Sequence, residues 1–122
     1  MKYALLLTNS QEDRERWEKL SEEEAKASRA AEVPKWNALF GELGASGKLL
    51  SGSELDDPGT AKTIRVRDGE RSVTDGPFAE TKEQIGGLMV IDADDLDEAI
   101  SITARIPVAE RASVEIRPLV EG

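Results

Sequence analysis

The segment TDGPFAETKEQIGG, residues 74–87, joins two different sequence patterns. Its Asp-Gly-Pro run is typical of a tight turn, because proline fixes φ and glycine accepts dihedral angles that other residues avoid. We expect Phe78 to pack this turn against the core. Gly86 and Gly87 stand at the start of a strand pattern, and such a pair predicts a bulge or a close approach of another backbone.

The patterns on either side of this segment are a hairpin and a core strand. Residues 62–75, KTIRVRDGERSVTD, alternate in polarity around Asp68-Gly69, the dipeptide that a type I′ turn prefers. Residues 88–93, LMVIDA, are apolar on both faces, as are residues 2–9, KYALLLTN. Strands of this kind are usually covered on both sides of their sheet.

Two helices are predicted after the first strand. Residues 10–20 form a short polar helix with Trp17 as an anchor, and a second helix begins at Ser21, where Glu24 completes a capping box. We expect Pro34 to kink or restart this second helix. Its apolar face is defined by four residues at helical spacing: Trp36, Leu39, Phe40 and Leu43.

The remaining elements follow from similar signals. Gly44 or Gly47 is expected to end the long helix, and residues 48–55, KLLSGSEL, form a second strand. Asp95 caps another helix, and residues 107–120 supply a short turn and a last strand. The face of that helix is expected to be Leu96, Ala99, Ile100 and Thr103.

This order predicts an α+β fold in one domain spanning residues 1–122. It is a ferredoxin-like βαββαβ arrangement with an inserted β-hairpin and both helices on one face of an antiparallel sheet. Because two strands are apolar on both faces, the face without helices needs a cover, and a second copy of the chain is the expected one. We therefore predict a homodimer built sheet to sheet.

Composition excludes several kinds of chemistry. The 122 residues include no cysteine and no histidine, which excludes disulfides, thiolate nucleophiles and Ser-His or Cys-His pairs. Acid–base catalysis would therefore fall to a carboxylate, a lysine or Tyr3, each with a perturbed pKa.

Charge and hydropathy limit the kinds of molecule that the protein is expected to bind. The formal charge of −9 argues against nucleic acid, whose binding needs a basic surface. No apolar run is long enough to cross a membrane, so a cytoplasmic protein is expected. The carboxylate runs at 22–24 and 92–98 stand at helix starts and lack the spacing of a calcium loop, so neither a metal nor another cofactor is expected.

The candidate site consists of Arg65, Asp75, Lys82 and Glu83. One of the two charged side chains at 82–83 is expected to point inward, where a buried charge needs a partner, and Arg65 on the hairpin can supply one. The structural alternative is that Asp75 only holds the turn through backbone N–H groups. Trp36 packs in the core by default, or lines a pocket together with Trp17.

The motif DGPFAETKEQIGG, with TIRVRDG before it and LMVIDADDLDEA after it, resembles the DGPF group of the YCII-related proteins over essentially the whole chain. The resemblance implies a dimeric α+β barrel with a ferredoxin-like protomer, and a bacterial origin. Most members have no assigned activity, and some are encoded beside extracytoplasmic-function sigma factors or fused to them.

A few relatives resemble enzymes that use a His-Asp pair, among them a dehydrochlorinase acting on a chlorinated aromatic. Counted back from Gly47, the histidine of that pair would fall near Trp36, and the aspartate would fall at Ile106, before Pro107. That mechanism is therefore absent from this chain.

Three functions remain open. The first is a homodimer that binds a small molecule in a cleft near the motif, between the long helix and the sheet or at the dimer seam, without catalysis. The second is a small isomerase, lyase or hydrolase that uses a carboxylate base with Lys or Arg stabilising an anion. The third is a regulator that docks an extracytoplasmic-function sigma factor.

Overall fold

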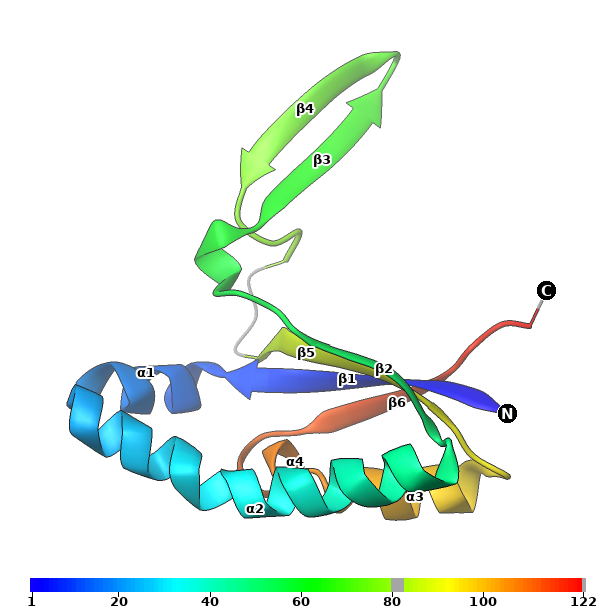
Figure 1. The fold of residues 1–122 in the computed structure, drawn as a ribbon. Coiled ribbons are helices and arrows are strands. Elements are labelled where there is room, and N and C mark those ends of the chain that lie inside the picture. Colours follow the sequence, from blue (N-terminus) through cyan, green and yellow to red (C-terminus); the bar gives the residue numbers. More distant parts are fainter. Residues whose placement is uncertain (80–82, 122) are drawn as a thin grey trace.

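The computed structural model describes residues 1–79 and 83–121. The chain forms two sets of strands and a layer of helices (Figure 1). In chain order the elements are β1 Lys2–Ser10, α1 Gln11–Lys19, α2 Glu22–Ser46, β2 Leu49–Glu54, the 3-10 turn η1 Pro58–Thr60, β3 Lys62–Arg67, β4 Glu70–Asp75, β5 Glu83–Asp92, α3 Leu96–Thr103, α4 Val108–Arg111 and β6 Val114–Pro118.

The main sheet has the strand order β2-β5-β1-β6, and every neighbouring pair in it is antiparallel. The helices lie on one side of this sheet (Figure 1). This is an α+β architecture consistent with the expected ferredoxin-like arrangement. Strands β3 and β4 pair with each other in a separate two-stranded ribbon.

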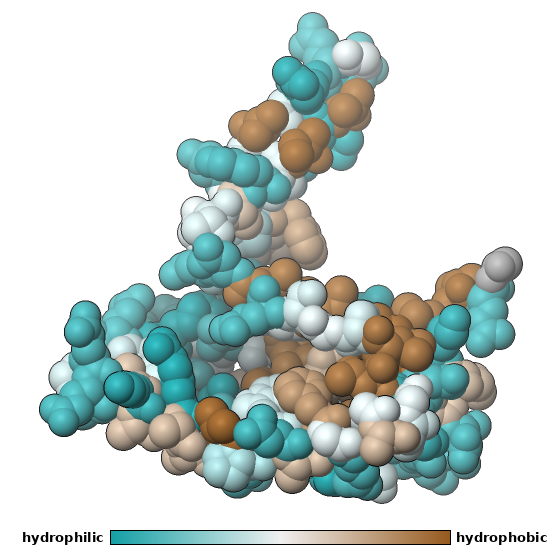
Figure 2. Space-filling view, in the orientation of Figure 1, coloured by the Kyte–Doolittle hydropathy of each residue, from teal (hydrophilic) through white to brown (hydrophobic). Residues whose placement is uncertain are grey.

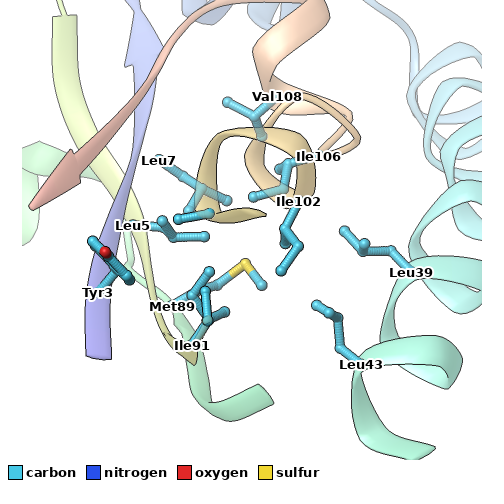
Figure 3. Close-up of a cluster of buried hydrophobic side chains, with 12 residues drawn as sticks. Tyr3, Leu5, Leu7, Leu39, Leu43, Met89, Ile91, Ile102, Ile106 and Val108 are labelled. Carbon is cyan, nitrogen blue, oxygen red and sulfur yellow. The ribbon is translucent and has the colours of Figure 1, made fainter. Parts of the chain in front are cut away.

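The core lies between the sheet and the helices. β1 and β5 are paired so that Tyr3 is opposite Ile91 and Leu5 is opposite Met89, and all four side chains are buried. Figure 3 shows these side chains facing others from α2 and from the segment that contains α3 and α4. The helical contributors are Leu39, Leu43, Ala99, Ile102, Ile106 and Val108.

Local chemistry sets the ends of the helices as predicted. The Ser21 side chain accepts a hydrogen bond from the Glu24 backbone N–H, and Asp95 accepts one from Glu98 N–H in the same way. Gly47 ends α2 with φ 72°, a left-handed conformation that favours glycine. The hairpin turn is also confirmed, because Asp68 and Gly69 both have positive φ.

The predicted bulge is present at Gly86. The pairing of β1 with β5 passes from Leu7 opposite Gly87 to Thr8 opposite Ile85, which leaves Gly86 without a partner in the register. A Cβ atom on Gly86 would lie 3.3 Å from the Cβ atom of Asn9. Glycine is therefore favoured here, because the neighbouring strand approaches closely and a larger residue would have to displace Asn9 slightly.

One prediction for a single residue is wrong, and another is wrong in part. α2 is continuous from Glu22 to Ser46, so the helix does not restart at Pro34, and the alternative of a kink there stays a prediction. Phe78 is 80% exposed instead of packing in the core, because the turn that carries it lies at the base of the ribbon, away from the helical layer.

The buried face of α3 differs partly from the prediction. Ala99 and Thr103 are buried as expected, but Leu96 and Ile100 are about half exposed and Ile102 takes their place. The buried side chains are those of Ala99, Ile102, Thr103 and Ile106. Their spacing of i, i+3, i+4 and i+7 is also that of one helical face. No helix in the described part of the chain is long and apolar enough to cross a membrane.

Candidate functional site

A cleft of about 750 Å³ lies between α2 and the main sheet. Only the second half of α2 packs closely on the core, because its buried residues are Leu39 and Leu43. The cleft lies where the rest of the helix is not packed against the sheet. Met89 and Gly87 of β5 and Leu7 of β1 contribute to the sheet side of the cleft. The volume is in the range of pockets that hold small molecules.

The α2 side of the cleft is aromatic. Trp36 and Phe40 are one helical turn apart, and their rings stack with centroids 5.2 Å apart and an interplanar angle of 25°. Trp36 packs against the core and lines the cleft at the same time, so both interpretations of this residue hold. Phe40 is 37% exposed although it belongs to the predicted apolar face. A flat molecule could stack on this pair of rings.

Charged side chains from three helices meet at another part of the cleft. Asp13 of α1 is only 8% exposed, and its carboxylate accepts a hydrogen bond of 3.0 Å from Arg16. The Nε atom of Arg111, in α4, lies 3.6 Å from Asp13 and 3.4 Å from Glu32 of α2. Asp13, Glu32 and Arg111 all line the cleft. We call these three residues the charged cluster.

The guanidinium group of Arg111 is incompletely satisfied within the charged cluster. Its Nε and one terminal nitrogen are buried and make no hydrogen bond with any part of the chain that the structure describes. Buried polar groups are nearly always hydrogen-bonded, so such an exception requires an explanation. Arg111 also lines the cleft, so its guanidinium group is a candidate hydrogen-bond donor to a ligand oxygen there.

Trp17 connects this cleft to a second hollow. The guanidinium groups of Arg16 and Arg29 lie 5.6 and 5.5 Å from its ring centroid, which is cation–π distance. The second hollow has a volume of about 570 Å³. It shares Asn9, Trp17, Glu54 and Gly86 with the first. The two hollows are therefore neighbours, and both reach the bulge in β5.

The residues proposed from the motif lie elsewhere. Asp75 accepts a hydrogen bond from the Lys62 ammonium across the ribbon, and Arg65 is opposite Ser72 in the same ribbon. Glu83 begins β5 and accepts a hydrogen bond of 3.2 Å from the Ser113 hydroxyl. Arg65, Asp75 and Glu83 are not among the lining residues of either hollow. Lys82 lies outside the described residues, so the site that includes it stays a prediction.

The charged cluster was missed because nothing in the local sequence marks it. Asp13 stands in the first turn of a polar helix, where an acidic residue normally matches the helix dipole. Glu32 and Arg111 are single charged residues within ordinary helical segments. Among the residues that the structure describes, no group of three or more His, Cys, Asp or Glu side chains could hold a metal ion.

The YCII-related domain matches residues 1–121 of this sequence. The chain belongs to the YCII-related family. An uncharacterised protein of Rhizobium meliloti (strain 1021) is 36% identical to this YCII-related chain over 121 residues, covering 98% of the chain and 92% of that protein.

A solved structure is similar to this YCII-related protein in fold. It is 5-chloro-2-hydroxyhydroquinone dehydrochlorinase from Burkholderia phenoliruptrix, in complex with 2,5-dihydroxybenzoquinone. The TM-score is 0.53 at 14% sequence identity, and the match covers 100% of this chain and 96% of that one. In the present chain, Trp36 lines the cleft and Ile106 is fully buried in the core.

Proposed function

We propose that this YCII-related protein binds a small planar molecule in the cleft between α2 and the main sheet, without catalysing its conversion. The observation that carries the proposal is the combination of a stacked aromatic pair, Trp36 and Phe40, with the incompletely satisfied guanidinium of Arg111 in one cavity. Sites for small molecules typically combine apolar walls with a few polar groups that fix orientation.

The chemistry of the walls defines the class of ligand. A ring that stacks on Trp36 and Phe40 would bury its faces between these side chains and Met89. An oxygen atom on its edge, from a carbonyl, hydroxyl or carboxylate group, would accept a hydrogen bond from Arg111. The 2,5-dihydroxybenzoquinone bound by the structurally similar dehydrochlorinase belongs to this class, which supports the choice of an oxygenated ring.

The test is a binding titration with 2,5-dihydroxybenzoquinone and with benzoate as probes. Trp17 and Trp36 are the only tryptophans of the chain and both line the cleft, so tryptophan fluorescence should report binding directly, with calorimetry as the check. We expect Trp36→Ala and Arg111→Met each to weaken binding by about tenfold or more. Ile100→Ser, a change on the exposed side of α3, is the control. Binding that is equal in all four proteins would contradict the proposal.

An enzyme is the second candidate, because the cleft contains a buried carboxylate. Asp13 would act as the base and Arg111 would stabilise the anion formed in an isomerisation or elimination. The contacts of Asp13 with Arg16 and Arg111 favour binding over catalysis, since they engage its oxygen atoms with cations. Time-resolved NMR of a bound chlorinated hydroquinone separates the two functions: conversion that disappears in Asp13→Asn would establish the enzyme.

We also propose that the protein is a homodimer joined through the sheet face opposite the helices, as in a dimeric α+β barrel. This face carries Ala4, Leu6, Leu88 and Val90 in the centre of the sheet, and Leu88 is 39% exposed. An apolar face of this kind favours a self-complementary contact. Sedimentation of the wild type and of Leu88→Arg is the test, and a wild-type monomer at micromolar concentration would contradict it.

The motif and the charge support three finer proposals. The sequence DGPFAETKE favours membership in the DGPF group of the family. A cytoplasmic location, with no binding to nucleic acid, agrees with the charge of −9. Docking of an extracytoplasmic-function sigma factor is the third proposed function, and co-purification with a sigma factor encoded beside the gene is its test.

A further inference from the structure

The β3–β4 ribbon has an apolar face that nothing in the chain covers. Ile64 and Val66 point to the same side because they are two residues apart in β3, and Val73 joins them because it is paired with Ile64. These three side chains are 58–60% exposed. Figure 2 shows hydrophobic atoms on the ribbon, which stands away from the rest of the molecule.

Phe78 adds another exposed apolar side chain three residues after the end of β4. It is 80% exposed, and only Val120 is more exposed among the large apolar side chains of the described residues. A two-stranded ribbon is marginally stable in water by itself and needs another surface to pack against. The exposure of Ile64, Val66, Val73 and Phe78 together therefore indicates a contact made outside the protomer.

We infer that this ribbon packs against a second copy of the same chain, and we call it the arm. The inference rests on the proposed homodimer and adds a second contact to it. The first reason is position: the ribbon rises on the side of the sheet opposite the helices, which is the side of the open apolar face (Figure 1). A two-fold partner seated on that face would have the ribbon beside it.

The length of the ribbon fits this contact. Each of its strands has six residues, which corresponds to about 20 Å at the usual rise of a β-strand. Two packed sheets are only about 10 Å apart. A ribbon that rises from one sheet would thus extend beyond the plane of the partner sheet and pack along its side, and symmetry would produce the same contact twice.

Charge favours a copy of this acidic chain as the partner. Residues 62–75 carry four Lys or Arg and three Asp or Glu side chains, whereas the whole chain has a formal charge of −9. Two copies at −9 repel each other unless the contact surfaces reduce the repulsion. A slightly basic arm laid against the acidic body of the other copy does so, because Arg71 is paired with Val66 and therefore lies on the apolar face of the ribbon.

The test compares dimer dissociation constants by analytical ultracentrifugation. The ribbon variant carries Ile64→Ser, Val66→Ser and Val73→Ser, and Phe78→Ser is made separately. We expect the ribbon variant to weaken dimerisation by roughly 100-fold and Phe78→Ser by about tenfold or more. Ile100→Ser, which removes a half-exposed apolar side chain from α3, should leave the constant unchanged. Equal constants in all four proteins would overturn the inference.

A deletion provides a second test if the ribbon variant fails to fold. The backbone N–H of Gly76 donates to the Ala61 carbonyl at 2.8 Å, so the ribbon begins and ends at nearly the same point. Residues 62–75 can therefore be replaced by a two-glycine linker with little effect on the main sheet. We expect the shortened chain to keep its circular dichroism and its ligand titration but to dimerise about 100-fold more weakly.

Leu88→Arg separates this inference from the proposed homodimer. If the wild type is a dimer that Leu88→Arg disrupts while both ribbon changes leave it intact, the sheet-face dimer stands and the arm is wrong. If the wild type is a monomer, both are wrong. Loss of dimerisation in the ribbon changes, with binding of 2,5-dihydroxybenzoquinone retained, would establish the arm independently of the cleft.

Discussion

The Nε atom of Arg111 lies 3.6 Å from the Asp13 carboxylate, and the same atom is 3.4 Å from Glu32. One guanidinium group of α4 therefore lies within ion-pair distance of carboxylates from both α1 and α2. Arg111 is the link between these two helices at the charged cluster, so both stability and ligand binding should depend on it.

We expect Arg111→Met to lower the free energy of unfolding by about 1–3 kcal/mol. A fully buried partner would give roughly 3–5 kcal/mol, but Arg111 and Glu32 are each 28% exposed and solvent reduces the effect. Thermal unfolding measures the change. Arg117→Met, which removes an exposed pair with Glu115, is the control and should change stability by less than about 0.5 kcal/mol. Equal effects of the two variants would contradict the role of Arg111.

The Lys48–Glu98 pair predicts a pH dependence. The hydrogen bond from the Lys48 ammonium, followed by one from the Asp94 backbone N–H, holds the pKa of the Glu98 carboxyl below its ordinary value. The pair therefore stabilises the fold fully above the unfolded pKa, about 4.3. This stabilisation is lost as the pH falls through the lower folded pKa.

An NMR titration of the Glu98 carboxyl carbon tests this directly. In Lys48→Met the pKa of Glu98 should rise toward the ordinary value without reaching it, because the Asp94 N–H still donates to the carboxylate. The complementary effect is that Glu98 raises the pKa of Lys48. An unchanged Glu98 pKa in the variant would show that the hydrogen bond does not form in solution.

Two glycine-to-alanine changes should alter the stability of the fold in opposite directions. Gly41 lies in α2, and a Cβ atom there would meet nothing within 4 Å. Gly41→Ala should raise stability by about 0.5–1 kcal/mol, since glycine lowers helix stability. Gly86→Ala should lower it by about 1 kcal/mol, because the new methyl group would press on Asn9 at the bulge. Urea unfolding of both variants measures the difference, and a stabilised Gly86→Ala would be inconsistent with the close packing there.

Asp75→Asn should have little effect on stability. The Asp75 side chain is 85% exposed and its partner Lys62 is also exposed, so the pair resembles other surface ion pairs. We expect a change below about 0.5 kcal/mol, or roughly 3 °C or less in Tm. A drop of several degrees would instead show that Asp75 holds the turn through its backbone contacts, as the structural interpretation of the motif requires.

Most of the fold could be predicted because short stretches determine its elements. Asp68-Gly69 adopts positive φ at both residues. Ser21 and Asp95 begin helices and Gly47 ends one, each through contacts within four residues. Phe78 shows where this reasoning fails. An apolar residue beside a turn normally packs inward, and only the position of the ribbon relative to the sheet determines that this one does not.

The candidate cleft could not be predicted in the same way. Asp13 and Arg111 lie near opposite ends of the chain, and each has an ordinary explanation in its own helix. Their proximity, and the burial of Asp13 that makes it notable, arise only when α1, α2 and α4 pack on the same sheet. The DGPF motif is recognisable because its residues are consecutive in the sequence. The residues that line the cleft are scattered along the chain and form no local motif.

The central position of β1 has a consequence for biosynthesis. β1 is made before β2 and the three helices α1, α2 and α3, yet its two neighbours in the sheet are β5 and β6, which are made after α1, α2 and the ribbon. The nascent chain therefore carries an apolar strand without its partners during most of translation. Assembly of the core should begin only once β5 has emerged, so this chain is expected to depend on its last third before any part of it resists proteolysis.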